Sequence, residues 1–195
     1  MSDTATAILS EEKNTGKGLV GAGIVLFIIS ILAGFSIALG NSKAGSYFFI
    51  APFFVMAALL TVIGRHYQKK YQILGQTPLE LEGGCCVIGQ ETPAKITVFK
   101  PNFGRVQELK LTCWRRHSGS SQTGYQEVWS ERFAVNQCTD AAHTQLSATI
   151  IVPEGKKPTT RSLMARNKHH WELSFEYVES MSLIKRTWKL AVVSA

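Results

Sequence analysis

Two long runs of apolar residues dominate the first third of the chain. Gly18 to Leu39 and Tyr47 to Gly64 contain no side chain that is charged at neutral pH. A helix rises about 1.5 Å per residue and the hydrocarbon core of a bilayer is about 30 Å thick, so roughly 17 to 20 apolar residues can cross it. Both runs reach that length, and the rest of the chain is too small to bury two helices that are apolar all round. The pattern predicts a transmembrane helical hairpin over residues 18–64.

A cleaved signal peptide is the alternative interpretation of the first run. Ala38, Leu39 and Gly40 loosely resemble a small-residue cleavage site. However, the run is longer than the apolar region of a signal peptide, and a second apolar run follows it directly. The membrane hairpin is therefore favoured.

The residues inside the two runs bear on packing and transport. Gly18 and Ala22, and likewise Gly34 and Ala38, stand four positions apart in the first run. Small residues at this spacing predict a face that packs closely against the second helix. Since neither run contains a charged residue, a transport pathway through the helices is disfavoured.

Positive charges near the two runs predict their orientation. Lys13 and Lys17 precede the first run, Lys43 is the one basic residue of the connecting loop, and a basic cluster follows the second run: Arg65, Lys69 and Lys70. By the positive-inside rule both ends of the hairpin face the cytoplasm. The large C-terminal part is then cytoplasmic.

The hydrophobic period changes to two beyond Arg65. In the segments 106–114, 145–152 and 170–177, apolar and polar residues alternate, which is typical of half-buried antiparallel strands. Four further segments complete a set of about seven candidate strands: 79–84, 94–99, 125–135 and 183–193. Their number and spacing favour a β-sandwich of the immunoglobulin or arrestin-like kind. The predicted domains are a polar N-terminal tail (1–17), the helical hairpin (18–64), a basic juxtamembrane linker (65–78) and the sandwich (79–195).

The excess of positive charge lies in the C-terminal part of the chain. Of 195 residues 45% are hydrophobic and 18% charged, and the formal net charge is +7. The first 64 residues carry equal numbers of acidic and basic side chains, so the whole excess lies beyond them. Arg65, Lys69 and Lys70 are candidates for contact with anionic lipid, although a topology signal explains them equally well. A second basic cluster is a candidate partner-binding loop: Lys156, Lys157, Arg161, Arg166 and Lys168.

Motifs for chemistry are missing from the sequence. There is no phosphate-binding GxxxxGK[ST] loop, no GxGxxG and no GxSxG. His169 and His170 are adjacent, so on a strand they point to opposite faces and cannot easily share a metal ion. The cysteines have no CxxC spacing and are interpreted as buried free thiols: Cys85, Cys86, Cys113 and Cys138. We expect no catalytic residues, no cofactor, no metal and no nucleic-acid binding.

The C-terminal part resembles the arrestin-like β-sandwich domain of bacterial two-pass membrane proteins. The similarity covers roughly Leu79 to Val193 and lies in the segments LELEGGCCVIGQ, LKLTCWRRHS, YQEVWSERF, TIIVPEGKKPTT and HHWELSFEYV. It implies a scaffolding or adaptor role and a bacterial inner membrane, and it transfers no active-site residues.

We therefore predict a non-catalytic, membrane-anchored β-sandwich that binds a protein partner or a second copy of itself, as an accessory subunit or an adaptor. The contact surfaces are expected at the sheet edges and at the loops 117–124 and 154–168. The alternative is a membrane-tethered small-ligand sensor or enzyme with a pocket in the β domain. A pore or transporter component is least favoured.

Overall fold

The computed structural model describes residues 7–39, 50–100, 103–118, 123–140, 142–160, 167–179 and 181–194. The chain divides into two compact units. The helical unit is Glu12–Ile73, and the β domain combines Met1–Glu11 with Leu74–Ala195. The β domain therefore takes its chain from both sides of the helical unit.

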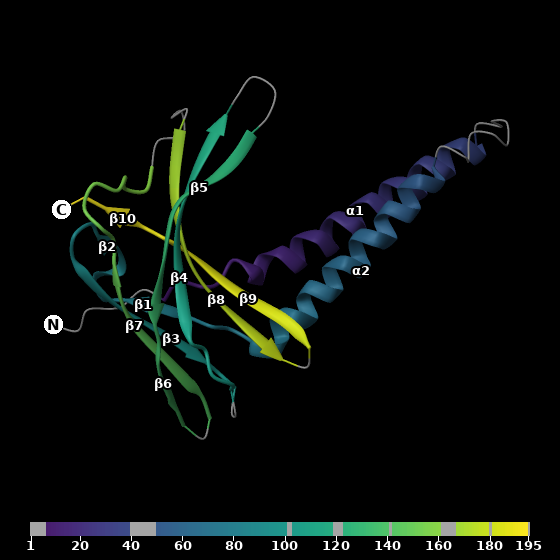
Figure 1. Cartoon of the computed structure of the whole chain (residues 1–195). Coiled ribbons are helices and arrows are strands. Elements are labelled where there is room, and N and C mark those ends of the chain that lie inside the picture. The colour runs from purple at the N-terminus through teal and green to yellow at the C-terminus, as the bar shows by residue number, and fades with distance from the viewer. Residues whose placement is uncertain are drawn as a thin grey trace. The chain divides into compact units, whose positions relative to one another are not determined.

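The helical unit contains α1 (Glu12–Leu39) and α2 (Ala51–Leu74), which lie side by side (Figure 1). One described helix is long and apolar enough to cross a membrane, namely α1 over Glu12–Ser36. The predicted hairpin of two membrane spans is therefore wrong, and the multi-pass topology drawn from it is not supported.

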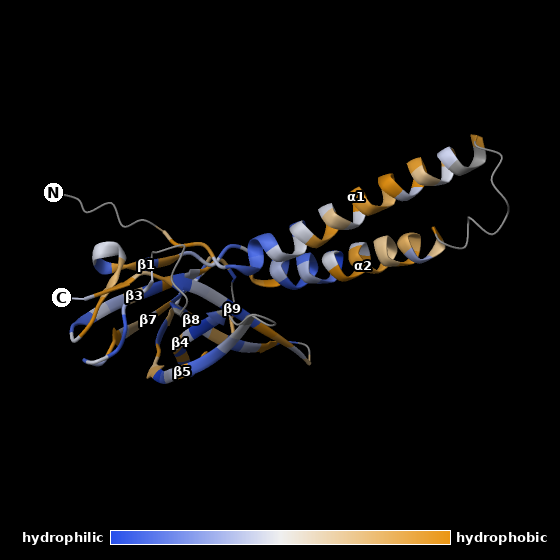
Figure 2. Ribbon diagram, turned by 90° about the horizontal axis from the view of Figure 1, so that it is seen from above, coloured by the Kyte–Doolittle hydropathy of each residue, from blue (hydrophilic) through white to orange (hydrophobic). Residues whose placement is uncertain are grey.

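The reason lies in the composition of α2. Its apolar part runs from Ala51 to Gly64, about 14 residues, which as a helix measures about 21 Å against the roughly 30 Å of a hydrocarbon core. Beyond Gly64 the helix continues through charged and polar residues to Leu74, as the blue C-terminal half of α2 shows (Figure 2). Residues 47–49, where the predicted span begins, lie outside the described residues.

Glycines set the packing of the two helices. Gly16 lies against Gly64, and Gly23 lies against Ala57, so the helices are antiparallel. A Cβ atom added to Gly64 would lie 2.8 Å from the backbone nitrogen of Val20. Small residues let the two backbones approach this closely.

The predicted packing face of α1 was wrong. A Cβ atom added at Gly18 or at Gly34 would meet nothing within 4 Å. The two helices instead meet at Gly16 and Gly23 of α1, which lie about two helical turns apart on one face. Several faces of α1 carry small residues, and only the position of α2 selects one of them.

The β domain contains ten strands in its described part. They are β1 (Leu79–Leu81), β2 (Cys86–Val87), β3 (Glu91–Val98), β4 (Glu108–Ser118), β5 (Thr123–Ala134), β6 (Asn136–Thr139), β7 (Thr144–Ile151), β8 (Asn167–Glu179), β9 (Ser182–Leu190) and β10 (Val192–Val193). The first sheet has the order β1-β3-β7-β6 and the second sheet the order β5-β4-β8-β9. All pairs within these two sheets are antiparallel.

The strand set differs from the predicted seven. Each predicted segment overlaps one of the longer strands or β1, but β2, β6 and β10 were not predicted. In addition, β10 pairs with β2 in parallel, so the domain is not wholly antiparallel. Strands of two to four residues are too short to show a hydrophobic period, which is why the sequence does not reveal them.

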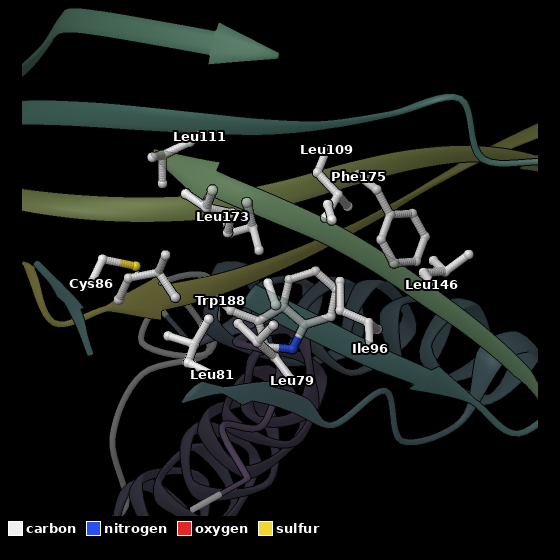
Figure 3. Packing of buried hydrophobic residues seen from close by; sticks show 14 of the residues in the cluster. Leu79, Leu81, Cys86, Ile96, Leu109, Leu111, Leu146, Leu173, Phe175 and Trp188 are labelled. Carbon is white, nitrogen blue, oxygen red and sulfur yellow. The ribbon is translucent and has the colours of Figure 1, made fainter. Parts of the chain in front are cut away.

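One hydrophobic core lies between the two sheets (Figure 3). The core takes Ile96 and Leu146 from the first sheet. It takes Leu109, Leu173 and Trp188 from the second sheet, and all five side chains are fully buried. The space between the sheets is therefore filled by apolar side chains, and burial of this kind is the main favourable term in folding.

The residues that precede α1 belong to the β domain. The backbone N–H groups of Ile8 and Leu79 each donate to the other residue's carbonyl oxygen, at 2.8 and 2.9 Å. The backbone nitrogen of Glu11 donates to the carbonyl oxygen of Thr187 on β9 at 2.9 Å, and its carboxylate lies 2.8 Å from Lys189 Nζ. Residues 8–11 are thus held by two strands, and α1 begins at the next residue.

Candidate functional site

The outer face of the second sheet is polar and aromatic. Because alternate residues of a strand point to one side, the residues of β4 that do not enter the core line this face. Trp114 lies opposite Glu127 of β5 and His170 of β8, and Arg116 lies opposite Tyr125 and Lys168. The pairing thus gathers side chains from three strands that are distant in sequence.

A surface hollow of about 460 Å³ lies over this part of the sheet. We call the side chains that line it from β4, β5, β8 and β9 the Trp114 cluster: Trp114, Arg116, Tyr125, Lys168, His170, Glu172 and Lys189. Thr159, Thr160 and His169 complete the wall.

Aromatic contacts order the Trp114 cluster. The guanidinium carbon of Arg116 lies 5.8 Å from the centre of the Tyr125 ring, a distance suited to a cation–π contact. The rings of Tyr125 and His170 meet edge to face, with centroids 5.5 Å apart. His170 Nε2 lies 3.3 Å from Glu172 Oε1. The cluster is therefore connected through its own side chains.

Trp114 contributes a hydrogen-bond donor that no described residue accepts. Its Nε1 atom is buried and has no acceptor among the described residues. A buried indole N–H normally has a partner, because leaving the donor unpaired costs free energy. Trp114 therefore gives the hollow an aromatic wall, with its unpaired donor beneath the surface.

Charge at the hollow is mainly positive. Arg116, Lys168 and Lys189 face one carboxylate of the cluster, Glu172. The hydrogen bond from Lys189 to Glu11 raises the pKa of that lysine, so it stays protonated. An anionic ligand fits this balance of charge.

His169 stands in the wall of the hollow as a neutral group. Burial lowers its pKa, and the nearby positive charges of Lys157 and Arg115, with His170, lower it further. Its backbone nitrogen donates to Thr160 Oγ1 at 3.0 Å. His169 therefore adds little positive charge at neutral pH.

Hydroxyl groups at the hollow are engaged in structural bonds. Thr159 Oγ1 donates to the carbonyl oxygen of Leu190 at 3.2 Å and accepts from the backbone nitrogen of Val192 at 2.9 Å. Thr160 Oγ1 accepts from His169. A hydroxyl nucleophile needs a free oxygen and an adjacent base. The arrangement suits binding better than covalent catalysis.

The structure separates the residues of the predicted partner-binding loop. Lys168 lies on β8 in the Trp114 cluster. Lys156 is half-buried, with its Nζ 5.5 Å from the centre of the Trp129 ring, and the carbonyl oxygen of Lys157 accepts from Trp171 Nε1 at 3.0 Å. Arg161 and Arg166 lie outside the described residues, as do residues 119–122 of the predicted tip 117–124.

The predicted lipid-contact residues belong to the other unit. Arg65, Lys69 and Lys70 lie on α2, where Arg65 and Lys69 are exposed and Lys70 is half-buried. They do not line the hollow of the Trp114 cluster.

Sequence reasoning missed most of the Trp114 cluster. The tryptophans at 0% exposure are Trp171 and Trp188, whereas Trp114 lines the hollow. The alternation in β4 places Trp114 and Arg116 on the face opposite Leu111 and was a usable signal. The partners on β5 and β8 follow only from strand register.

The four cysteines are free thiols, but the prediction that all four are buried was wrong for Cys85 and Cys138. Cys86 and Cys113 are buried, Cys85 is half-buried and Cys138 is exposed. Within the described part of the chain, no three His, Cys, Asp or Glu side chains are grouped so as to hold a metal ion.

Comparisons with known proteins add little. No protein-family model matches the chain, and no curated protein matches it. Among solved structures, the chain is similar to Spo0M, the sporulation control protein of Bacillus subtilis, at 13% identity and a TM-score of 0.43. The match covers 61% of this chain and 49% of Spo0M, about half of that protein's length. A likeness this distant carries no argument, and the arrestin-like resemblance stays a prediction.

Proposed function

We propose that this protein is a membrane-anchored β-sandwich binding module, an accessory subunit or adaptor, whose Trp114 cluster receives an acidic segment of a partner protein. The observation that carries the proposal is the hollow itself, which is lined by the Trp114 ring and by three cations, Arg116, Lys168 and Lys189. The filled core between the sheets supports a surface site over an internal pocket.

A photo-crosslinking experiment tests the site. Benzoylphenylalanine replaces Tyr125, which is 58% exposed, in the full chain expressed in its native membrane. The matched control places the same crosslinker at Arg132, on the same strand and with an exposed side chain. We expect a crosslinked partner with an acidic segment from position 125 only.

A charge reversal completes this test. Arg116→Glu should abolish the crosslink from position 125, because a glutamate in the hollow repels an acidic segment. Equal crosslinking from positions 125 and 132, or crosslinking that survives Arg116→Glu, contradicts the proposed site.

The membrane anchor in the proposal is α1. An arginine at the centre of a spanning helix costs about 2.5–3.5 kcal/mol on insertion. Ile28→Arg should therefore shift the protein from the carbonate-resistant membrane fraction to the soluble or aggregated fraction, while Lys17→Arg should not. If Ile28→Arg leaves the membrane fraction unchanged, α1 is not the anchor.

A second candidate function is the recognition or conversion of a small anionic ligand. The pairing of His170 with Glu172 in the hollow favours it, because an imidazole beside a carboxylate is a common acid–base arrangement. It predicts saturable quenching of tryptophan fluorescence by a small carboxylate such as citrate. The quenching should be lost in Trp114→Phe, and its absence from the wild-type protein contradicts this candidate.

A further inference from the structure

The turn between β8 and β9 carries large apolar side chains in solvent. Val178 and Leu183 lie directly opposite each other at the end of this hairpin, at 66% and 53% exposure. Met181, in the turn, is 100% exposed. Soluble domains seldom expose grouped apolar side chains without a function. We call Val178, Met181 and Leu183 the apolar tip.

The backbone at the apolar tip is strained. Met181 has φ 62°, the single positive φ of a residue other than glycine among the described residues. Glycine or asparagine would relieve this conformation. The turn instead holds a fully exposed methionine there, so the apolar side chain is retained against a conformational cost.

A further apolar side chain lies at the same end of the domain. Phe99 is 61% exposed and directly follows β3. The next residue, Lys100, is ion-paired with Glu179, near the end of β8. Phe99 therefore extends the apolar surface beyond the hairpin.

Basic side chains flank the apolar tip. A hollow of about 590 Å³ on the outer face of the second sheet is lined by Val178 and by four cations: Arg105, Lys110, Arg132 and Lys185. Two carboxylates, Glu108 and Glu176, also line it, and Glu176 lies opposite Lys185 in the sheet, so the cations are in excess by two. Lys110 is paired with Glu127 and Arg132 with Glu108. Arg105 and Lys185 have no ion pair among the described residues. Apolar side chains beside such cations match the acyl and phosphate layers of an anionic bilayer.

Connectivity argues for lipid as the occupant. The strand β9 carries Leu183 at one end of the hairpin and Thr187 four residues later, about 13 Å along a strand. Thr187 accepts the hydrogen bond from Glu11, and α1 starts at the next residue. A bilayer that holds α1 is therefore the apolar phase nearest to the apolar tip along the chain.

We propose that the apolar tip and Phe99 insert into the interfacial layer of an anionic membrane, with Arg105 and Lys185 at the lipid phosphates. This rests on the membrane anchoring in the proposed function and is independent of the Trp114 cluster. The β domain is then attached to the bilayer in two ways: through its chain connection to α1, and directly through the inserted side chains of the apolar tip and Phe99.

Spin labelling of the full chain in lipid nanodiscs tests this proposal. Met181→Cys is labelled in a background of Cys85→Ser and Cys138→Ser, while the buried Cys86 and Cys113 are left in place. The matched control labels Glu154→Cys, an exposed position after β7. Strand register places it at the opposite end of the first sheet from Phe99, because Glu91 pairs with Ile151 and Val98 with Thr144.

The readout is collision of the label with oxygen, which concentrates in lipid, and with a nickel chelate, which stays in water. In phosphatidylserine nanodiscs we expect the label at 181 to lose nickel accessibility and gain oxygen accessibility, while the label at 154 stays open to nickel. Arg105→Gln with Lys185→Gln should restore nickel accessibility at 181.

Two results would overturn the proposal. Equal nickel accessibility at 181 and 154 means that the tip stays in water, and shielding of 181 from both reagents means that protein covers it, such as a second copy. Failure of the protein to enter nanodiscs overturns the anchoring itself, so the two failures are distinguishable. Unchanged near-ultraviolet circular dichroism shows that each labelled variant is folded.

Discussion

The indole nitrogen of Trp188 donates a 2.9 Å hydrogen bond to the carbonyl oxygen of Thr77. Both residues are fully buried, and the Trp188 ring packs against Phe175 with centroids 5.6 Å apart. One side chain of β9 thus fills the core and also holds the segment through which the chain enters β1. The stability of the β domain and the position of its entry segment are therefore coupled.

Trp188→Phe should destabilise the β domain by about 2–4 kcal/mol, because it leaves the Thr77 carbonyl unpaired and opens a cavity. The control is Trp114→Phe, which removes an N–H without an acceptor among the described residues. Urea unfolding of the full chain in detergent measures both. Equal losses for the two variants would contradict the role given to Trp188.

Gly64→Ala should weaken the packing of α1 on α2 by about 1–3 kcal/mol, because its Cβ would meet the Val20 backbone at 2.8 Å. Gly34→Ala is the matched control, since its Cβ meets open space and alanine favours helix. Thermal loss of the helical circular dichroism signal in detergent reports the difference. A Gly64→Ala protein as stable as Gly34→Ala argues against the close contact.

Alkylation should divide the cysteines by burial. Burial raises the pKa of Cys86 and that of Cys113 to about 11 each, so at pH 8 roughly one thiol in a thousand is ionised. Cys138 is exposed and should react with N-ethylmaleimide first, as mass spectrometry of the native protein would show. Rapid modification of Cys86 or Cys113 before unfolding would disprove this order.

Acid should destabilise the β domain through His169. Its pKa is lowered in the folded state, mainly by burial, so below about pH 6.5 the unfolded chain binds more protons than the folded one. The stability that neutral His169 contributes to the folded β domain is fully present above about pH 6.5, and it is lost as the pH falls towards the folded-state pKa of His169. His169→Gln should flatten the change in urea midpoint between pH 7.5 and 5.5. Identical pH dependence in wild type and His169→Gln would refute the assignment.

The basic cluster on α2 remains a proposal for lipid contact. Each cation near an anionic leaflet contributes about 1 kcal/mol, so replacing Arg65, Lys69 and Lys70 together by glutamine should weaken binding of a fragment from residue 65 onward to phosphatidylserine vesicles by about 3 kcal/mol. Co-sedimentation measures it, with phosphatidylcholine vesicles as the control. Unchanged sedimentation would show that these residues do not seat the chain on lipid.

The elements that were predicted correctly are those that short stretches of consecutive residues specify. The apolar run of α1 and the period-two segments in β4, β7 and β8 are written in consecutive residues, and side-chain direction along a strand follows from that spacing alone. The second predicted span failed because apolar composition does not show where a helix begins: α2 starts at Ala51, so its apolar part is too short to cross a bilayer.

Long-range contacts explain what was missed. Trp114, Tyr125 and His170 meet because β4 pairs with β5 and with β8 in one register, and a shift of one residue would send them to the other face. Arg186 occupies a core position between Ile184 and Trp188 on β9, with 1% exposure, where the alternation alone leads one to expect an apolar residue.

The sequence by itself determined which segments are apolar, which alternate, and where the positive charge accumulates, since each is a property of neighbours along the chain. Only the tertiary structure decided which strands pair and in what register, which face of α1 meets α2, and which basic and aromatic side chains share a hollow. Those outcomes depend on packing between residues far apart in sequence, whose free energies no local pattern records.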